Sequence, residues 1–200
     1  MKKTIGVLSL QGAFIEHEEM LRSLGACCVE IRNKNDLARP IDGLILPGGE
    51  STVQGKLLAD EGLLLPLKEK IEQGLPVLAT CAGMILLAQH ISNNICRGFG
   101  TLPVTVERNA YGRQLGSFIT TLDVKGIGPM RMNFIRAPFI TKAAPEVDIL
   151  STVENHIVAV RYRNQIALSF HPEVSEDTRI HEMFLELVDS YQRSVFGEQG

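Results

Sequence analysis

The segment VLATCAGMIL, residues 77–86, decides the fold expected for this chain. Residues 77–80 are a short, mainly apolar run typical of a buried strand, and the apolar run of residues 82–88 indicates a helix. Cys81 stands at the junction, where a sharp strand-to-helix turn pushes a nucleophilic side chain out of the sheet. Small residues on both sides of it allow the strand and the helix to pass close together. The segment therefore predicts an α/β fold that displays Cys81 at the end of a strand.

Strand and helix patterns alternate outward from this segment through the first half of the chain. Strands are predicted at residues 5–10, 28–31, 43–46 and 76–80, and helices at residues 14–24, 63–73 and 82–88. Strands that are joined through helices need crossover connections, which favour a parallel sheet with helices on both faces.

The second half of the chain contains more short strand patterns, divided by turn residues. We expect strands at residues 104–106, 118–124, 131–135, 149–153, 157–162 and 166–170, and then a closing helix over 177–191. The predicted fold is a three-layer open α/β sheet, mostly parallel with antiparallel additions in the second half. No linker or repeat divides it, so residues 1–200 are expected to form a single domain whose last few residues are a loose tail.

Composition excludes several classes of protein. Of the 200 residues, 44% are hydrophobic and 22% are charged, which is typical of a globular chain. The net charge of −3 offers no basic excess for a phosphate backbone, so no nucleic acid partner is expected. The apolar run at 82–88 is far shorter than the ~20 residues that cross a bilayer, which favours a cytoplasmic location without membrane contact. The four cysteines form no C-x-x-C pair and the histidines lack metal-ligand spacing, so we expect no metal site.

Two segments supply a candidate nucleophile and a candidate base. The helix start after Cys81 favours a thiolate, because unpaired N–H groups and the helix dipole stabilise negative charge there; the alternative is an ordinary buried cysteine. His171, in the segment SFHPE at 169–173, follows an apolar strand and should lie where sites on open α/β sheets form. Glu173 can orient the imidazole, although a surface turn with a solvated carboxylate is the alternative. The occurrence of both segments in one chain favours a triad.

A glycine-containing loop and two arginines complete the candidate site. In PGGES, residues 47–51, adjacent glycines after a strand can turn backbone N–H groups toward a ligand, as an oxyanion hole requires. A plain glycine turn is the alternative, whereas a phosphate-binding loop is rejected because its spacing and hydroxyl residue are missing. Arg108 and Arg136 each follow an apolar strand. They are either solvated edge residues or partners for the α-carboxylate of an amino acid.

The same segments carry a resemblance to a known family. TCAG at 80–83, HPE at 171–173 and PGGES at 47–51 resemble the nucleophile turn, His-x-Glu pair and oxyanion loop of class I glutamine amidotransferases. Within that class, the glutaminase subunits of pyridoxal 5′-phosphate synthases are especially similar. The characteristic segments are GVLSLQGA at 6–13 followed by Glu16 and His17, LILPGGEST at 44–52, VERNAYGRQ at 106–114, FIRAP at 134–138 and SFHPE at 169–173, and the most specific of them are ERN and FIRAP. Ala79 departs from the pattern, because a glycine usually stands there.

The resemblance implies a reaction and a set of roles. The reaction is hydrolysis of L-glutamine to L-glutamate and ammonia through a thioester on Cys81, with His171 as base and Glu173 as its partner. The implied glutamine-binding residues are Gly49, Glu50, Ser51, Arg108, Ile135 and Arg136. The implied oxyanion hole consists of the backbone N–H groups of Gly49 and Ala82.

The resemblance also implies a partner. A synthase subunit in a hetero-oligomer would receive the ammonia for pyridoxal 5′-phosphate (vitamin B6) biosynthesis, and this chain would need no cofactor. Three alternatives stay open: the glutaminase subunit of another amidotransferase, a γ-glutamyl hydrolase, and a catalytically silent scaffold that binds a partner.

Overall fold

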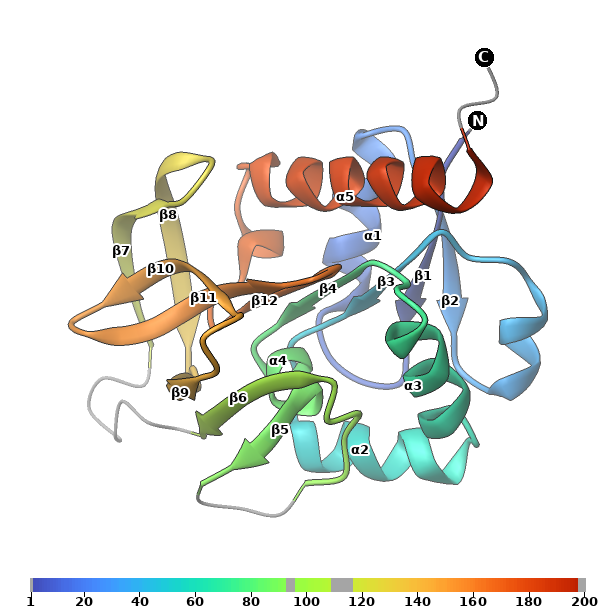
Figure 1. Ribbon diagram of the computed structural model, residues 1–200, viewed down its shortest axis with the longest axis horizontal. Coiled ribbons are helices and arrows are strands. Elements are labelled where there is room, and N and C mark those ends of the chain that lie inside the picture. Colours follow the sequence, from blue (N-terminus) through green and yellow to red (C-terminus); the bar gives the residue numbers. More distant parts are fainter. Residues whose placement is uncertain (1, 93–95, 109–116, 198–200) are drawn as a thin grey trace.

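The computed structural model describes residues 2–92, 96–108 and 117–197, and Figure 1 shows how their elements are arranged. The strands are β1 (Thr4–Leu8), β2 (Cys27–Ile31), β3 (Gly43–Leu46), β4 (Val77–Thr80), β5 (Ala88–Ile91), β6 (Leu102–Glu107), β7 (Ser117–Val124), β8 (Gly128–Ile135), β9 (Phe139–Ala143), β10 (Asp148–Val153), β11 (His156–Tyr162) and β12 (Gln165–Leu168). The helices are α1 (Phe14–Ser23), α2 (Ser51–Asp60), α3 (Leu64–Glu72), α4 (Ala82–Leu87) and α5 (Arg179–Phe196), with two 3-10 turns, η1 (Lys34–Ala38) and η2 (Pro172–Val174). Residues 198–200, part of the expected tail, lie outside the described residues.

One half of the large sheet is parallel throughout. Its strand order is β2-β1-β3-β4-β12, and each neighbouring pair runs in the same direction. From β1 the chain passes through α1 to β2 on one side, whereas β3 and β4 extend the sheet on the other side. Ligands of open α/β sheets bind outside the carboxyl ends of the strands where the strand order reverses. The loops after β1, β3 and β4 are therefore in position to form a site.

The other half of the sheet contains the antiparallel additions. It continues as β12-β11-β9-β6-β5, in which β11 is antiparallel to both β12 and β9, and β9 is antiparallel to β6. β10 pairs with β11 as a side branch, and β7 and β8 form a separate hairpin. The predicted fold class, an open sheet with antiparallel additions in the second half, is confirmed.

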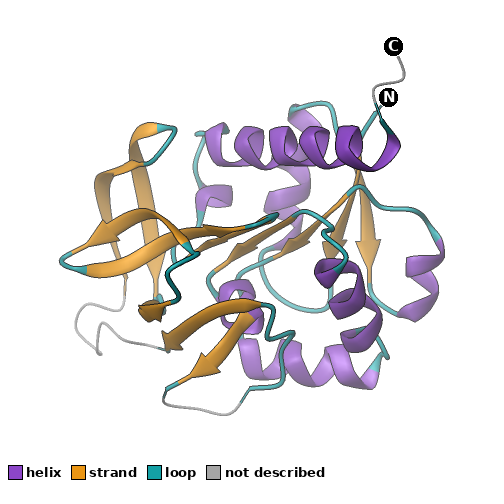
Figure 2. Ribbon diagram, viewed as in Figure 1, coloured by secondary structure: helices purple, strands orange, loops and turns teal. Residues whose placement is uncertain are grey.

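Helices cover both faces of the sheet, which gives the three layers expected from the sequence (Figure 2). Helices α1 and α5 pack on one face, where Leu21 and Phe184 are fully buried. Helices α2, α3 and α4 pack on the other face, where Leu58 and Leu67 are fully buried. Burial of each such side chain stabilises the fold by roughly 1.5–3 kcal/mol. The two apolar layers hold the parallel strands, and with them the loops at their carboxyl ends.

Helix α2 is absent from the elements predicted by the sequence, because Gly55 lowers helix propensity and polar Gln54 interrupts the apolar pattern. Both residues have structural reasons. A Cβ at Gly55 would lie 2.2 Å from the carbonyl oxygen of Arg97, so only glycine allows this approach. The buried side chain of Gln54 donates to the carbonyl oxygen of Gln11 at 2.8 Å. The buried face of α2 therefore supports the loop after β1 as well as the core.

Other boundaries also differ from the prediction. The first strand ends at Leu8 instead of continuing to residue 10, because residues 9–13 turn away to form the loop before α1. The predicted helix at 82–88 ends at Leu87, and the chain passes directly into β5, which was not predicted. β9 was missed as well, although it joins β11 to β6. Within the described ranges, no helix is long and apolar enough to cross a membrane.

Candidate active site

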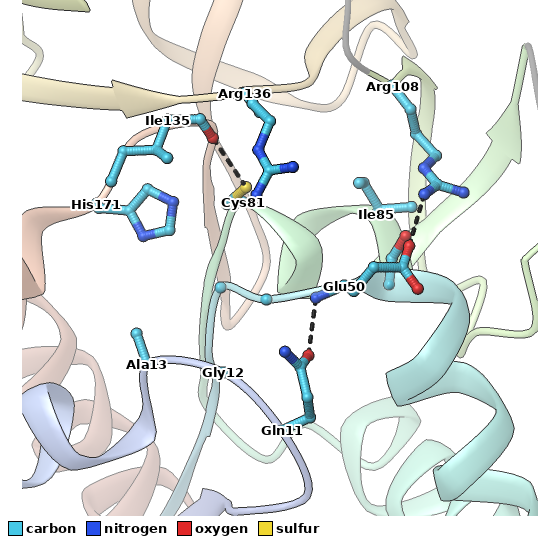
Figure 3. Close-up of a pocket in the computed structure, with 13 residues that line it drawn as sticks. Gln11, Gly12, Ala13, Glu50, Cys81, Ile85, Arg108, Ile135, Arg136 and His171 are labelled. Atoms are coloured by element: carbon cyan, nitrogen blue, oxygen red, sulfur yellow. Dashed lines mark hydrogen bonds and ion pairs between the residues drawn. The ribbon is translucent and has the colours of Figure 1, made fainter. Parts of the chain in front are cut away.

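A pocket with a cavity of about 400 Å³ opens at the carboxyl ends of the parallel strands. The loops after β1, β3, β4 and β12 meet there with the end of β8, and Figure 3 shows the side chains around it. The lining residues are Gln11, Gly12, Ala13, Gly48, Gly49, Glu50, Ser51, Cys81, Ile85, Arg108, Ile135, Arg136 and His171. Such a concave, partly polar cavity at this edge of the sheet is the expected place for a small-molecule site.

Cys81 occupies the turn between β4 and α4. Its φ of 48° is rare for a residue with a side chain, and such strain is typical of functional turns. Its backbone N–H donates to the carbonyl oxygen of Leu168 at 2.8 Å, which fixes the turn to β12. A Cβ at Gly83 would lie 2.1 Å from the carbonyl oxygen of Leu46, so the close packing of α4 on β3 requires glycine there. The expected need for small residues around Cys81 has this physical basis.

Ala79, which replaces the glycine usual in the resembled family, lies within β4. It pairs with Leu46 of β3 and Ala167 of β12 and is fully buried. The methyl group is part of the apolar layer beneath α4, together with Leu46 and Met84. The fold therefore accommodates this departure in the strand, before the turn that carries Cys81.

His171 and Glu173 lie next to Cys81 at the end of β12 and in η2. The Nδ1 atom of His171 is 2.6 Å from Oε1 of Glu173, and the glutamate side chain is fully buried. Burial by itself lowers the pKa of His171, but hydrogen bonds to Cys81 and Glu173, with their negative charge, raise it to about 10. Burial raises the pKa of Glu173, but His17 and His171 together hold it below its usual value. The pair is therefore a buried carboxylate beside a protonated imidazole.

The glycine loop after β3 is held on both sides. The N–H of Gly48 donates to Oγ1 of Thr80 at 3.0 Å, and the carbonyl oxygen of Gly48 accepts from the N–H of Ala13, also at 3.0 Å. Gly12 has a φ of +105°, and a Cβ there would lie only 1.9 Å from the Gly48 oxygen. A Cβ at Gly48 would lie 2.3 Å from the His171 ring. Glycines are therefore needed on both loops to bring them together beside His171.

Glu50 and Arg108 form the charged wall of the pocket. Oε1 of Glu50 accepts from Nη2 of Arg108 at 2.7 Å. The backbone N–H of Glu50 donates to Oε1 of Gln11 at 2.8 Å (Figure 3). Burial alone raises the pKa of Glu50, but the N–H groups of Val53 and Thr52 and the charge of Arg108 together lower it. Glu50 is therefore an anion that caps α2 and faces the pocket at the same time.

Ile135 and Arg136 reach the pocket from the end of β8. The carbonyl oxygen of Ile135 lies 4.0 Å from the Cys81 sulfur, and Arg136 has a φ of 44°. Figure 3 shows the side chain of Arg136 pointing into the pocket beside Cys81. Ser51 is buried at the start of α2, and its hydroxyl has no hydrogen-bond partner within the part of the chain that the structure describes.

The structure brings together the residues that the sequence singled out. Of these residues, Glu173 lies behind His171, Ala82 begins α4, and the others line the pocket. Residues 109–114 of the VERNAYGRQ segment lie outside the described residues. Among the described residues, no group of three His, Cys, Asp or Glu side chains could hold a metal ion.

Sequence reasoning gave no pocket role to Gln11, Gly12, Ala13 and Ile85, and it singled out Thr80 only as part of the TCAG segment. The position of Gln11, Gly12 and Ala13 after the first strand could have indicated this role, because the loop after β1 must reach the same sheet edge as the loops after β3 and β4. Two buried histidines, His17 and His181, were also given no role, although His17 belongs to the Glu16-His17 pair that carries part of the family resemblance. Both histidines stand on the apolar face of a helix, and this position could have indicated that they are buried.

Comparisons with known proteins identify the class and then the family. A crystal structure of a glutamine amidotransferase superposes with a TM-score of 0.88 and 43% sequence identity, over 92% of this chain and 98% of that one. The fold is that of a glutamine amidotransferase. Residues 7–190 match the SNO glutamine amidotransferase family, and the chain belongs to that family.

Two curated relatives carry the same name. The pyridoxal 5′-phosphate synthase subunit PdxT of Desulfitobacterium hafniense (strain DSM 10664 / DCB-2) is 58% identical over 184 residues, which cover 92% of each chain. The protein of the same name from Streptococcus pneumoniae (strain CGSP14) is 51% identical over 186 residues, which cover 92% of this chain and 96% of the relative.

Proposed function

We propose that this protein is the glutaminase subunit of a pyridoxal 5′-phosphate synthase, which hydrolyses L-glutamine to L-glutamate and delivers ammonia to a synthase partner. Family membership and the two relatives support this function. The observation that carries it is Cys81 at a strained helix start, lining a cavity of small-molecule size together with His171, whose ring is 2.6 Å from the buried Glu173.

The chemistry begins with Cys81 and His171. His171 holds the thiol proton, and the sulfur attacks the side-chain amide carbon of glutamine. The tetrahedral intermediate collapses when the C–N bond breaks and His171 protonates the departing nitrogen, which leaves as ammonia. A water molecule then gives a proton to His171 and attacks the thioester carbon, which releases glutamate and returns the proton to Cys81. Glu173 stabilises the imidazolium in both halves of the reaction.

The backbone N–H groups of Gly49 and Ala82 are the proposed oxyanion hole. The N–H and C=O of a trans peptide point in opposite directions. Because the Gly48 carbonyl points to Ala13, the Gly49 N–H of the same peptide points away from Ala13. The Ala82 N–H belongs to the first turn of α4, where N–H groups lack helical partners. Two such donors stabilise the oxygen charge that develops during attack.

Glutamine recognition is assigned to the charged wall and its neighbours. Glu50, held ionised, suits the α-ammonium group, and the guanidinium groups of Arg108 and Arg136 suit the α-carboxylate. The buried Ser51 hydroxyl and the Ile135 backbone complete the polar lining. This arrangement favours an amino-acid substrate that enters with its side-chain amide toward Cys81.

The whole chain is proposed to act as one glutaminase domain within a hetero-oligomer. Free ammonia is rapidly protonated in water, so direct transfer to a docked synthase subunit keeps the product reactive. A cytoplasmic location stays a prediction.

The test is glutamate release from L-glutamine, measured with and without the synthase subunit from the same organism. We expect release in the presence of the synthase and pyridoxal 5′-phosphate formation when both sugar phosphate substrates are supplied. Glutamate release without transfer to that synthase would favour another amidotransferase, and no release under either condition would reject the glutaminase function.

A further inference from the structure

Glu173 lies between two imidazoles, only one of which faces the pocket. On the pocket side, Nδ1 of His171 is 2.6 Å from Oε1. On the opposite side, Nε2 of His17 from α1 is 3.5 Å from Oε2, and both side chains are fully buried. Oε2 has no hydrogen-bond partner within the described residues. His17 is therefore the polar group that faces the second oxygen of this carboxylate.

The same nitrogen of His17 also reaches the glycine loop through one hydroxyl. Nε2 of His17 is 3.2 Å from Oγ1 of Thr80, and that oxygen accepts the N–H of Gly48 at 3.0 Å. Thr80 is fully buried at the end of β4 and directly precedes Cys81. One ring nitrogen thus joins the acidic end of the triad to the backbone beside the proposed oxyanion hole.

A second histidine decides which nitrogen of His17 carries the proton. Nδ1 of His17 is 2.9 Å from Nε2 of His181 on α5, and Nδ1 of His181 has no partner within the described residues. If Nε2 of His181 donates to Nδ1 of His17, then His17 is protonated on Nε2, toward Glu173 and Thr80. The reverse arrangement would turn a lone pair toward a carboxylate and leave a buried N–H on His181 without an acceptor. The network therefore selects the Nε2–H tautomer of His17.

We propose that His17 is a positioning residue of the glutaminase reaction, a neutral imidazole that directs its Nε2–H toward Oε2 of Glu173 and toward the Thr80 hydroxyl that holds Gly48. The proposal rests on the proposed function, because it assigns Glu173 to a working triad. His17 touches neither the pocket nor the reacting atoms.

Charge states support this role. Burial lowers the pKa of His17 despite Glu173, which raises it, and burial also lowers the pKa of His181, to about 3. The other titratable groups that influence His17 are His171, which lowers its pKa, and Glu16 of its own helix, which raises it. A neutral His17 leaves the carboxylate charge to His171, whereas an imidazolium there would compete for it. An N–H that points toward Oε2, 3.5 Å away, favours the charged form of Glu173, because it stabilises negative charge on that oxygen.

Two substitutions of similar size separate this role from simple packing. His17→Asn leaves an amide oxygen near Nδ1 that can accept from His181 but removes the N–H that faces Glu173. His17→Gln places an amide N–H near the original Nε2. With the synthase present, we expect His17→Asn to lower kcat about tenfold at unchanged KM. The acid limb of its kcat–pH profile should move up by about one pH unit, because Glu173 is protonated more easily without the N–H that faces it. His17→Gln should restore most of the rate and the original acid limb.

Leu21→Ala is the matched control, because Leu21 lies one turn further along α1 and is equally buried but belongs to the apolar layer. The Leu21→Ala variant should have a lower melting temperature and the same acid limb of the kcat–pH profile as the unmodified protein. Imidazole ¹⁵N NMR of the unmodified protein gives a second readout that needs no variant, and it should show His17 neutral and protonated on Nε2.

A His17→Asn protein with the wild-type rate and pH profile, or an NMR spectrum with His17 charged or protonated on Nδ1, would overturn the proposal. A wild-type protein that releases no glutamate with the synthase would reject the glutaminase function instead, while the NMR experiment would still test the His17 geometry.

Discussion

On the pocket side of Glu173, the partners of His171 raise its pKa to about 10, whereas burial lowers the pKa values of His17 and His181 on the buried side. Burial acts in the same direction on all three rings and favours the neutral form. What differs is the partner. Nδ1 of His171 lies 2.6 Å from Glu173, whereas Nε2 of His17 lies 3.5 Å from the same carboxylate and Nδ1 of His17 lies 2.9 Å from His181. The partners together outweigh burial at His171, whereas burial prevails at His17 and His181.

Removal of the thiol from the pocket side is expected to have the largest effect. Cys81→Ala should fold normally and release no glutamate, because it lacks the sulfur that attacks the amide in the pocket. A glutamine-mimicking electrophile should label Cys81 alone. Burial raises the pKa of Cys28 to about 11 and also raises that of Cys96, which disfavours their thiolates. Mass spectrometry of the labelled protein checks this, and stoichiometric labelling of another cysteine or residual turnover by the variant would contradict the triad.

Substitution of His171 should cost more turnover than substitution of its partner. His171→Asn removes the group that moves the proton and should lower kcat by roughly 10²–10⁴-fold. Glu173→Gln keeps the imidazole and weakens only its orientation and charge, so a smaller loss is expected. Steady-state kinetics with the synthase present measure both. The opposite order would show that the roles of base and orienting group are assigned wrongly.

The next largest effect is expected at the loop that meets the glycine loop after β3. In Gly12→Ala, the new Cβ would lie 1.9 Å from the Gly48 carbonyl oxygen, so the Gly48–Gly49 peptide must move. Displacement of one oxyanion donor should lower kcat roughly 10²-fold. Gly25→Ala is a matched control, since Gly25 also has a positive φ, +85°, but has no atom within 4 Å of the added Cβ.

The Gly25 variant should lose stability without losing kcat. Thermal melts and glutamate release, measured on both glycine variants, separate backbone strain from loop displacement. Equal kcat losses in the two variants would mean that strain alone explains the effect.

The pocket side of the site could be predicted from the sequence because its residues follow strands. Cys81 and His171 each stand directly after an apolar segment that reads as a buried strand, and parallel strands bring their carboxyl ends to one edge. The fold class followed from the same alternation, and membership of the amidotransferase class followed from the residues on these turns.

The buried side could not be predicted in the same way. His17 and His181 lie 164 positions apart on two helices, and nothing local indicates that these helices meet behind Glu173. Helix α2 was missed for a related reason, because Gln54 and Gly55 serve contacts with distant segments and so break the apolar period. Polar residues on the buried face of a helix make contacts with distant segments, and in a search for hydrophobic periodicity they count only as interruptions of the helix pattern.

The smallest expected effect is a shift in the pKa of His171. It tests most directly the comparison between His171 on the pocket side of Glu173 and the two histidines on its buried side. Hydrogen bonds to Cys81 and Glu173 raise this pKa to about 10, so His171 should stay protonated through neutral pH and lose its proton only near that value. Cys81→Ala and Glu173→Gln each remove one of these partners while burial, which lowers the pKa, remains. Each should therefore lower the pKa of His171 by about one unit or more. His181 serves as an internal reference in the same NMR titration, since its pKa of about 3 keeps it neutral in all three proteins at pH 6–10. If His171 already titrates near 6.5 in the unmodified protein, its partners do not outweigh burial, and the distinction between the two sides of Glu173 is wrong.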